Sequence, residues 1–69
     1  MPLTLASLGE ENIIRHIGGP QEVRQHLADL GFSVGSTVMV VCSMGGNLIV
    51  SVKESRVAVS YEMAAKILV

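Results

Sequence analysis

A chain of 69 residues is large enough for one domain, and a domain this small needs a dense core because it buries only about 60% of its unfolded surface. Hydrophobic residues make up 49% of the sequence and only Phe32 and Tyr61 are aromatic, so we expect an aliphatic core. A single cysteine, Cys42, excludes an internal disulfide, and a net charge of −1 with scattered basic residues argues against a nucleic-acid partner.

The sequence contains no candidate membrane span and no signal peptide. Its longest apolar run, Val38 to Cys42, is far shorter than the roughly 20 residues that a membrane helix needs. The N-terminus lacks the basic region and the long apolar region of a signal peptide. We therefore expect one domain over residues 1–69, located in the cytoplasm.

The first part of the chain predicts an apolar lead-in followed by one strand. We expect the three leucines of residues 3–8 to anchor the N-terminus on the fold. Residues 12–17 contain three isoleucines, and β-branched side chains favour a pleated strand. Which face of this strand points inward stays open, because Ile13 and Ile17 share one side while Ile14 lies on the other.

Residues 20–30 predict an α-helix. Pro20 suits the first helical position, where its missing N–H has no intrahelical partner to lose. Apolar residues recur at i, i+4 and i+7 from Val23, which makes one apolar stripe. Gly31 then suits the position after the helix end, where a left-handed residue is common. Gly35 marks the turn into the next strand.

The rest of the chain predicts short strands and tight turns. Alternation places Cys42 on the same face as Val38 and Val40, so we expect it to be a small core residue. The expected elements are strands at 37–43, 48–53, 56–60 and 67–69, a hairpin turn at 44–47 with positive φ at Gly45 and Gly46, a polar turn at 53–56 and one helical turn at 61–66.

These elements together predict a mostly β fold. Five short strands with turns at this spacing are typical of a small barrel, and one α-helix lies between the first and second strands. An OB-like barrel is the other five-stranded barrel of this length. The short loops favour the SH3-like one.

No group of residues in the sequence predicts an active site or a metal site. His16 and His26 lie on different expected elements, and the adjacent carboxylates of Glu10 and Glu11 point apart. These histidines and Cys42 are too few and too scattered for a zinc site. We expect no catalytic residue, no cofactor and no bound metal, so the chain is not predicted to be an enzyme.

Several segments resemble one known family. Residues 27–38 (LADLGFSVGSTV), the tail at 56–69 (RVAVSYEMAAKILV) and the opening turn at 5–10 (LASLGE) occur in the order and spacing of the FeoA family, ferrous iron transport protein A. The pair Gly18–Gly19 also lies where the family often has glycines. The resemblance spans nearly the whole chain, although Val34 and the 44–47 hairpin lack prolines that are frequent in the family.

The resemblance implies an SH3-like accessory protein of bacterial ferrous iron uptake. Its partner would be the cytosolic part of FeoB, a membrane transporter with a GTP-binding domain, which the chain would bind and modulate without entering the membrane.

We expect partner contacts where folding constrains the residues least, at Arg24 and Gln25 on the helix and at Met44 and Asn47 in the hairpin. Four glycines are expected to serve the turns: Gly31, Gly35, Gly45 and Gly46.

Two other functions stay open. The same fold resembles the regulatory module of iron-dependent repressors of the diphtheria toxin repressor type. A generic SH3-like peptide-binding module is the second alternative, but recognition of proline-rich peptides uses aromatic-lined grooves. Phe32 and Tyr61 alone offer little for such a groove.

Overall fold

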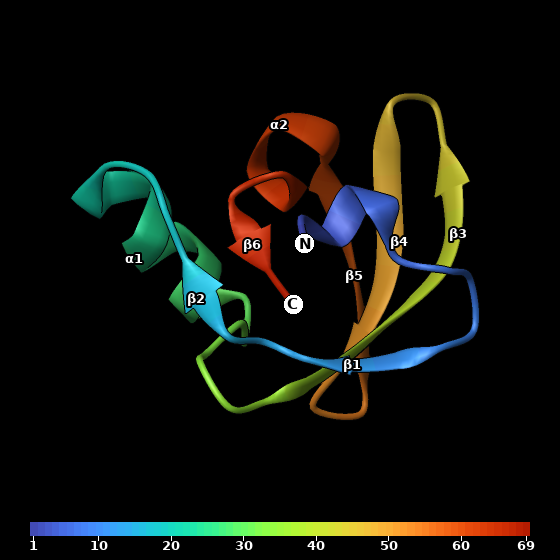
Figure 1. Ribbon diagram of the computed structural model, residues 1–69. Helices are drawn as coiled ribbons and strands as arrows, with labels where there is room; N and C mark the ends of the chain where they lie inside the picture. The colour runs from blue at the N-terminus through green and yellow to red at the C-terminus, as the bar shows by residue number, and fades with distance from the viewer.

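The computed structural model describes all 69 residues, and its strands form two antiparallel sheets (Figure 1). The larger sheet has the strand order β1-β3-β4-β5, and the smaller sheet pairs β2 with β6. The elements are a 3-10 helix η1 (Leu3–Leu5), β1 (Glu11–Ile13), β2 (His16–Ile17), α1 (Gln21–Asp29), β3 (Thr37–Met44), β4 (Asn47–Val52), β5 (Ser55–Ser60), α2 (Tyr61–Ala64) and β6 (Ile67–Leu68).

The predicted first strand is wrong as a single element, because the chain changes sheets in its middle. The N–H of Ile14 donates to the carbonyl of Ser36 at 2.9 Å, whereas the N–H of Arg15 donates to the carbonyl of Leu68 at 2.7 Å. This exchange of partners turns Ile14 into the core, fully buried, and leaves Ile13 59% exposed. The structure therefore has six strands in two sheets where the sequence predicts five in one barrel.

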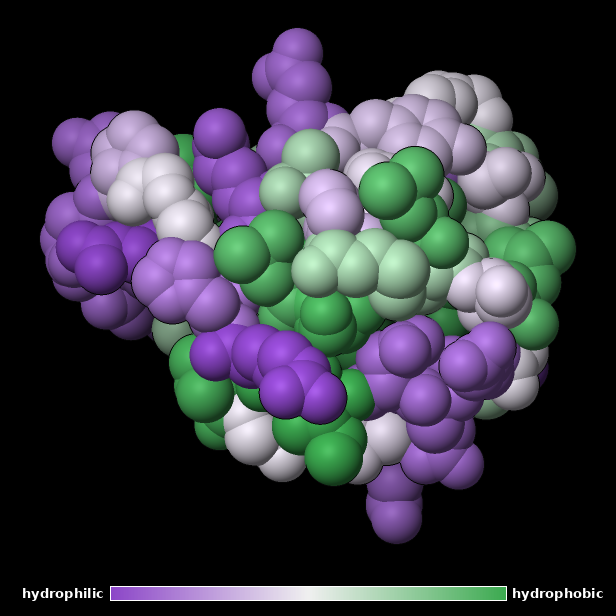
Figure 2. Space-filling view, viewed as in Figure 1, coloured by the Kyte–Doolittle hydropathy of each residue, from purple (hydrophilic) through white to green (hydrophobic).

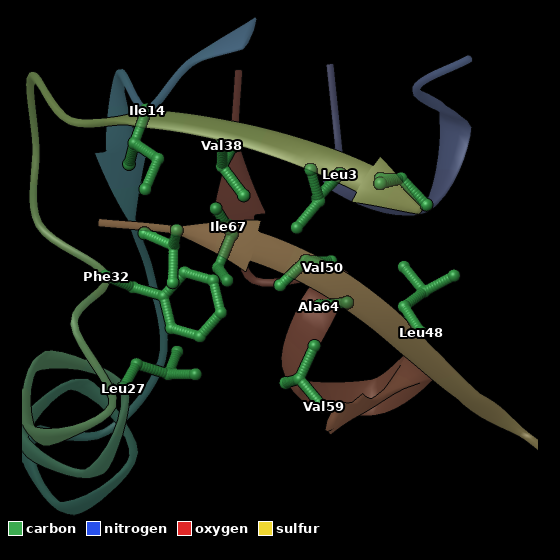
Figure 3. Packing of buried hydrophobic residues seen from close by; sticks show 12 residues of the cluster. Leu3, Ile14, Leu27, Phe32, Val38, Leu48, Val50, Val59, Ala64 and Ile67 are labelled. Carbon is green, nitrogen blue, oxygen red and sulfur yellow. The ribbon is translucent and has the colours of Figure 1, made fainter. Parts of the chain in front are cut away.

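Helix α1 follows β2 and ends in a Schellman motif. Pro20 is its N-cap and has extended backbone angles (φ −61°, ψ 159°), so the helix begins one residue later than predicted. Gly31 has a φ of +105°. Its N–H donates to the carbonyl of Ala28 at 3.0 Å, and the N–H of Phe32 donates to that of Leu27 at 3.0 Å. The motif brings the fully buried side chains of Leu27 and Phe32 together (Figure 3).

Strand β4 supplies the middle of the core. Leu48, Val50 and Val52 alternate inward, as the sequence predicts, and the last two pair with Val40 and Val38 of β3. No polar or charged residue is buried, so the core is held by apolar packing alone. Its members come from every part of the chain: Leu3, Ile14, Leu27, Phe32, Val38, Val40, Leu48, Val50, Val52, Val59, Ala64 and Ile67.

A β-bulge in β3 overturns the prediction that Cys42 is a core residue. Val40 pairs with Val50, but the next pair joins Cys42 to Ile49, which leaves Val41 without a partner of its own. Because a bulge inserts one residue, the side chains beyond it exchange faces. Cys42 consequently lies half-buried and outside the core, opposite the half-buried Ile49.

The lead-in is anchored by one leucine and not by three. Leu3 is fully buried, whereas Leu5 and Leu8 are 69% and 65% exposed. The two chain ends lie side by side (Figure 1). The N–H of Val69 donates to the carbonyl of Met1 at 2.8 Å, and the terminal amine of Met1 donates back to Val69 at 3.1 Å. The N-terminal residues thus continue the small sheet beyond β6.

Candidate interaction surface

The β3–β4 hairpin and the start of α2 form one end of the molecule, at the top of Figure 1. The turn has a φ of +56° at Gly45 and +82° at Gly46, and two positive φ values characterise a type I′ turn. Such turns match the natural twist of paired strands, so the conformation of the turn follows from its own two glycines. Met44, at its base, is 68% exposed.

Helix α2 is tied to the same hairpin. The N–H of Tyr61 donates to the carbonyl of Gly46 at 3.3 Å, and Asn47 pairs with Ser60 across β4 and β5. The hydroxyl of Ser60 accepts from the N–H of Met63 at 3.3 Å, which caps the helix. Tyr61 is thereby held beside the turn with its side chain 40% exposed. We call Met44, Gly45, Gly46, Asn47 and Tyr61 the hairpin end.

The polar face of α1 lies on another side of the molecule, at the left of Figure 1, and its side chains make the polar area there in Figure 2. Arg24 donates to the side-chain oxygen of Gln21 at 2.7 Å, and Gln25 donates to Asp29 at 3.0 Å. The four residues predicted for partner binding are all exposed but do not form one surface, since two lie on α1 and two in the hairpin. Their role in binding stays a prediction.

An open groove of about 420 Å³ lies on the outer face of the larger sheet. The register aligns Glu11, Met39 and Ser51 in one row across β1, β3 and β4. Sequence reasoning missed this groove because its residues come from separate segments and follow no motif. The signal that could have found it is the register of the outward-facing residues. The lining is Glu11, Ser36, Thr37, Met39, Ser51, Lys53 and Glu54.

The residues with ligand or catalytic chemistry remain apart in the fold. His16 lies on β2, His26 on α1 and Cys42 on β3. No group of three or more histidine, cysteine, aspartate or glutamate side chains is arranged to hold a metal ion. Neither α1 nor α2 has the length and apolar character of a membrane-crossing helix.

The fold belongs to the SH3-like class. A crystal structure of the iron uptake regulatory protein FeoA superimposes with a TM-score of 0.87 and 33% identity, covering 96% of this chain and 88% of that one. The zinc complex of Stenotrophomonas maltophilia FeoA, described as a prokaryotic SH3 domain protein, gives a TM-score of 0.79 at 23% identity, with coverage of 99% and 87%. A manganese-dependent transcriptional repressor shares the fold too, with a TM-score of 0.88 and 18% identity over 97% of this chain and 39% of that one.

The sequence is similar to that of proteins named for iron transport. Residues 1–69 match the model of the FeoA domain. The chain is 35% identical over 68 residues to the "Putative Fe(2+) transport protein A" of Methanocaldococcus jannaschii, which covers 99% of this chain and 83% of that protein. The chain belongs to the FeoA family, as the resemblance of its motifs indicates.

Proposed function

We propose that this chain is a cytoplasmic accessory protein of ferrous iron uptake that binds the cytosolic, GTP-binding part of a FeoB-type transporter and modulates it. The observation that carries the proposal is membership of the FeoA family over residues 1–69. The name of the Methanocaldococcus jannaschii relative, an Fe(2+) transport protein, supports it. In this proposal residues 1–69 act as one binding module without chemistry of their own.

The hairpin end supports a docking role. Met44 holds an apolar side chain in solvent at 68% exposure, on a turn that its own residues define. Tyr61 adds a partly exposed aromatic ring with a polar tip next to it. Binding a partner would remove this apolar surface from water, and aromatic residues and methionine are enriched at protein interfaces. We therefore place the transporter contact at Met44 and Asn47 before the α1 residues Arg24 and Gln25.

An amide-shift titration tests this proposal. The 15N-labelled chain is titrated with the isolated cytosolic GTP-binding domain of FeoB from the same organism, and we expect saturable shifts at the hairpin end. Met44→Ser should weaken the binding. Val34→Ser is the matched control, because Val34 is 65% exposed but precedes β3, whereas Met44 ends that strand. No shift with this domain or with full-length FeoB in detergent would overturn the proposal, as would undiminished Fe(II) uptake in a deletion strain under iron limitation.

The regulatory module of an iron- or manganese-dependent repressor is the second candidate function. The observation in its favour is the fold that the chain shares with a manganese-dependent transcriptional repressor. At 18% identity this likeness concerns the fold alone. The same titration, run with the DNA-binding domain of such a repressor from the same organism, separates the two. Shifts with the repressor domain and none with FeoB would favour the regulator.

A generic peptide-binding role has less support from the structure than from the fold class. Phe32 is fully buried against Leu27, which leaves Tyr61 as the one aromatic side chain at the surface. A groove for proline-rich peptides is built from several exposed aromatic rings. One partly exposed tyrosine does not supply such a groove.

A further inference from the structure

Strand β5 is an outer strand of the larger sheet, with β4 as its one partner. The two-residue turn between them fixes which backbone groups the ladder uses. Val52 and Ser55 flank the two-residue turn and form a hydrogen-bonded pair. From there, hydrogen-bonded and non-hydrogen-bonded pairs alternate along the two strands. The N–H and C=O groups of Val57 and Val59 therefore point to β4, whereas those of Arg56 and Ala58 point away. No turn, loop or cap uses these four outward groups.

This edge has few of the features that normally prevent strands from adding to it. Natural edge strands are commonly short, interrupted by proline or a bulge, or covered by charged side chains. Strand β5 has six residues, no proline and an unbroken register with β4. Its one charged residue, Arg56, lies near one end, and the exposed Ala58 in the middle has a small side chain.

We propose that this edge pairs with the same edge of a second copy of the chain, in antiparallel orientation and centred on Ala58. Within β5, Ser-Arg-Val-Ala-Val-Ser, this residue lies between two identical side chains, Val57 and Val59. Ala58 then faces Ala58 of the second copy in a bonded pair, and Val57 faces the other copy's Val59. Each Arg56 lies opposite a serine, Ser60, and the two arginines lie at opposite ends of the pair. Within the paired strands, no like charges therefore lie opposite each other.

The size of the contact predicts a weak dimer. Stable interfaces bury about 1,600 Å² in total, and one six-residue strand pair with small side chains buries much less. We expect a dissociation constant on the order of 0.1–1 mM, in the range of weak, transient contacts. The chain is therefore mostly a 7.3 kDa monomer in dilute solution, and its average mass rises toward twice that value as the concentration reaches the millimolar range. This proposal does not depend on the one made for iron transport.

Sedimentation equilibrium from about 20 μM to 2 mM tests the pairing, with Ala58→Pro as the decisive variant. Proline at this position removes an N–H that makes no bond to a turn, loop or cap, and edge strands accept proline where the N–H points outward. We expect Ala58→Pro to weaken the association at least tenfold. Ala58→Ser, which keeps both the N–H and a small side chain, should leave it within about twofold. A monomer throughout the range, or a dimer that Ala58→Pro leaves intact, would overturn the proposal.

Amide hydrogen exchange of the unmodified chain provides a second readout that does not depend on the folding of a variant. The amides of Arg56 and Ala58 should exchange several-fold more slowly at 2 mM than at 20 μM, whereas those of Val57 and Val59 should not change. If none of these four amides exchanges more slowly at 2 mM than at 20 μM, the pairing is contradicted, even if the protein dimerises. Slowing at the hairpin end alone would assign the dimer to another surface and would equally reject it.

Discussion

The two hairpins of the larger sheet share β4 and both turn in two residues, yet they are built from opposite kinds of residues. Gly45 and Gly46 occupy one turn, with φ values of +56° and +82°. Lys53 and Glu54 occupy the other, with φ values of +49° and +65°. Glycine adopts this region without steric cost, whereas other L-residues lose about 1–2 kcal/mol each there. The same geometry is therefore strain-free in one turn and strained in the other.

The surroundings explain how the strained turn persists. Next to it, Val52 is buried in the core, and a Cβ atom placed on Gly31 would lie 3.8 Å from Val52 and 3.9 Å from Lys53. The helix end thus packs against the strand that leads into the turn. No atom comes within 4 Å of Cβ positions on Gly45 and Gly46. One turn is defined by its own residues, and the other is imposed by the core that its strands share.

Among the substitutions that test this contrast between the two turns, the one at Gly31 should change the free energy of unfolding most. A β-branched residue at a φ of +105° is strongly strained, so we expect Gly31→Val to lower the free energy of unfolding by about 2–3 kcal/mol. Amide shifts should change around Lys53 and Glu54 and remain constant at the Gly45–Gly46 turn. Chemical denaturation and 15N spectra measure both. Gly18→Ala is the control, because its Cβ would make only ordinary contacts, 3.7 Å to the carbonyl of Lys66 being the shortest. Equal losses for the two variants would argue against the special role of Gly31.

Substitution in the Gly45–Gly46 turn should have the next largest effect on the free energy of unfolding. Gly46→Val places a β-branched residue at a φ of +82°, and we expect it to lower the free energy of unfolding by about 1–2 kcal/mol. Gly46→Asn should cost less than half of that, because asparagine tolerates the left-handed region. Thermal unfolding of the two variants gives the comparison. A valine as well tolerated as asparagine would show that the turn can change its type, and its geometry would then not depend on glycine.

The strained turn should respond in the opposite direction. Glu54→Gly relieves the strain at a φ of +65°, and the flexibility of glycine in the unfolded chain offsets part of the gain. We expect a net increase of about 0.5–1 kcal/mol in the free energy of unfolding. Glu54→Ala removes the same carboxylate and keeps the strain, so it should give no increase. A loss of stability with Glu54→Gly would mean that the glutamate side chain contributes more than its backbone strain costs.

The contrast between the turns also separates what the sequence could predict from what it could not. Features encoded by neighbouring residues were accessible: the helix that ends before Gly31, the inward alternation of β4 and the hairpin of 44–47. The change of sheets at Ile14 and the bulge at Val41 depend on strand pairing across the molecule, which no local pattern contains. The groove depends on the same pairing and was missed for the same reason.

The residues predicted to bind a partner differ from the fold in how much of them the sequence alone determines. Their exposure follows from local reasoning, because a hairpin tip and the polar face of a helix project into solvent in any compact arrangement. That Arg24 and Gln25 lie on another side than Met44 and Asn47 follows only from the three-dimensional structure (Figure 1). A single sequence contains no physical signal that favours either the α1 face or the hairpin as the binding site.

The smallest effect is expected at Met44, where the self-defined hairpin meets solvent. At 68% exposure its side chain gives little to the core, so Met44→Ser should change the free energy of unfolding by less than about 0.5 kcal/mol. Val34→Ser, at 65% exposure, should behave alike. Chemical denaturation measures both. A loss above about 1 kcal/mol for Met44→Ser alone would mean that the side chain packs onto the end of the sheet in solution. The hairpin end would then be part of the folded core, and its apolar surface would no longer support docking.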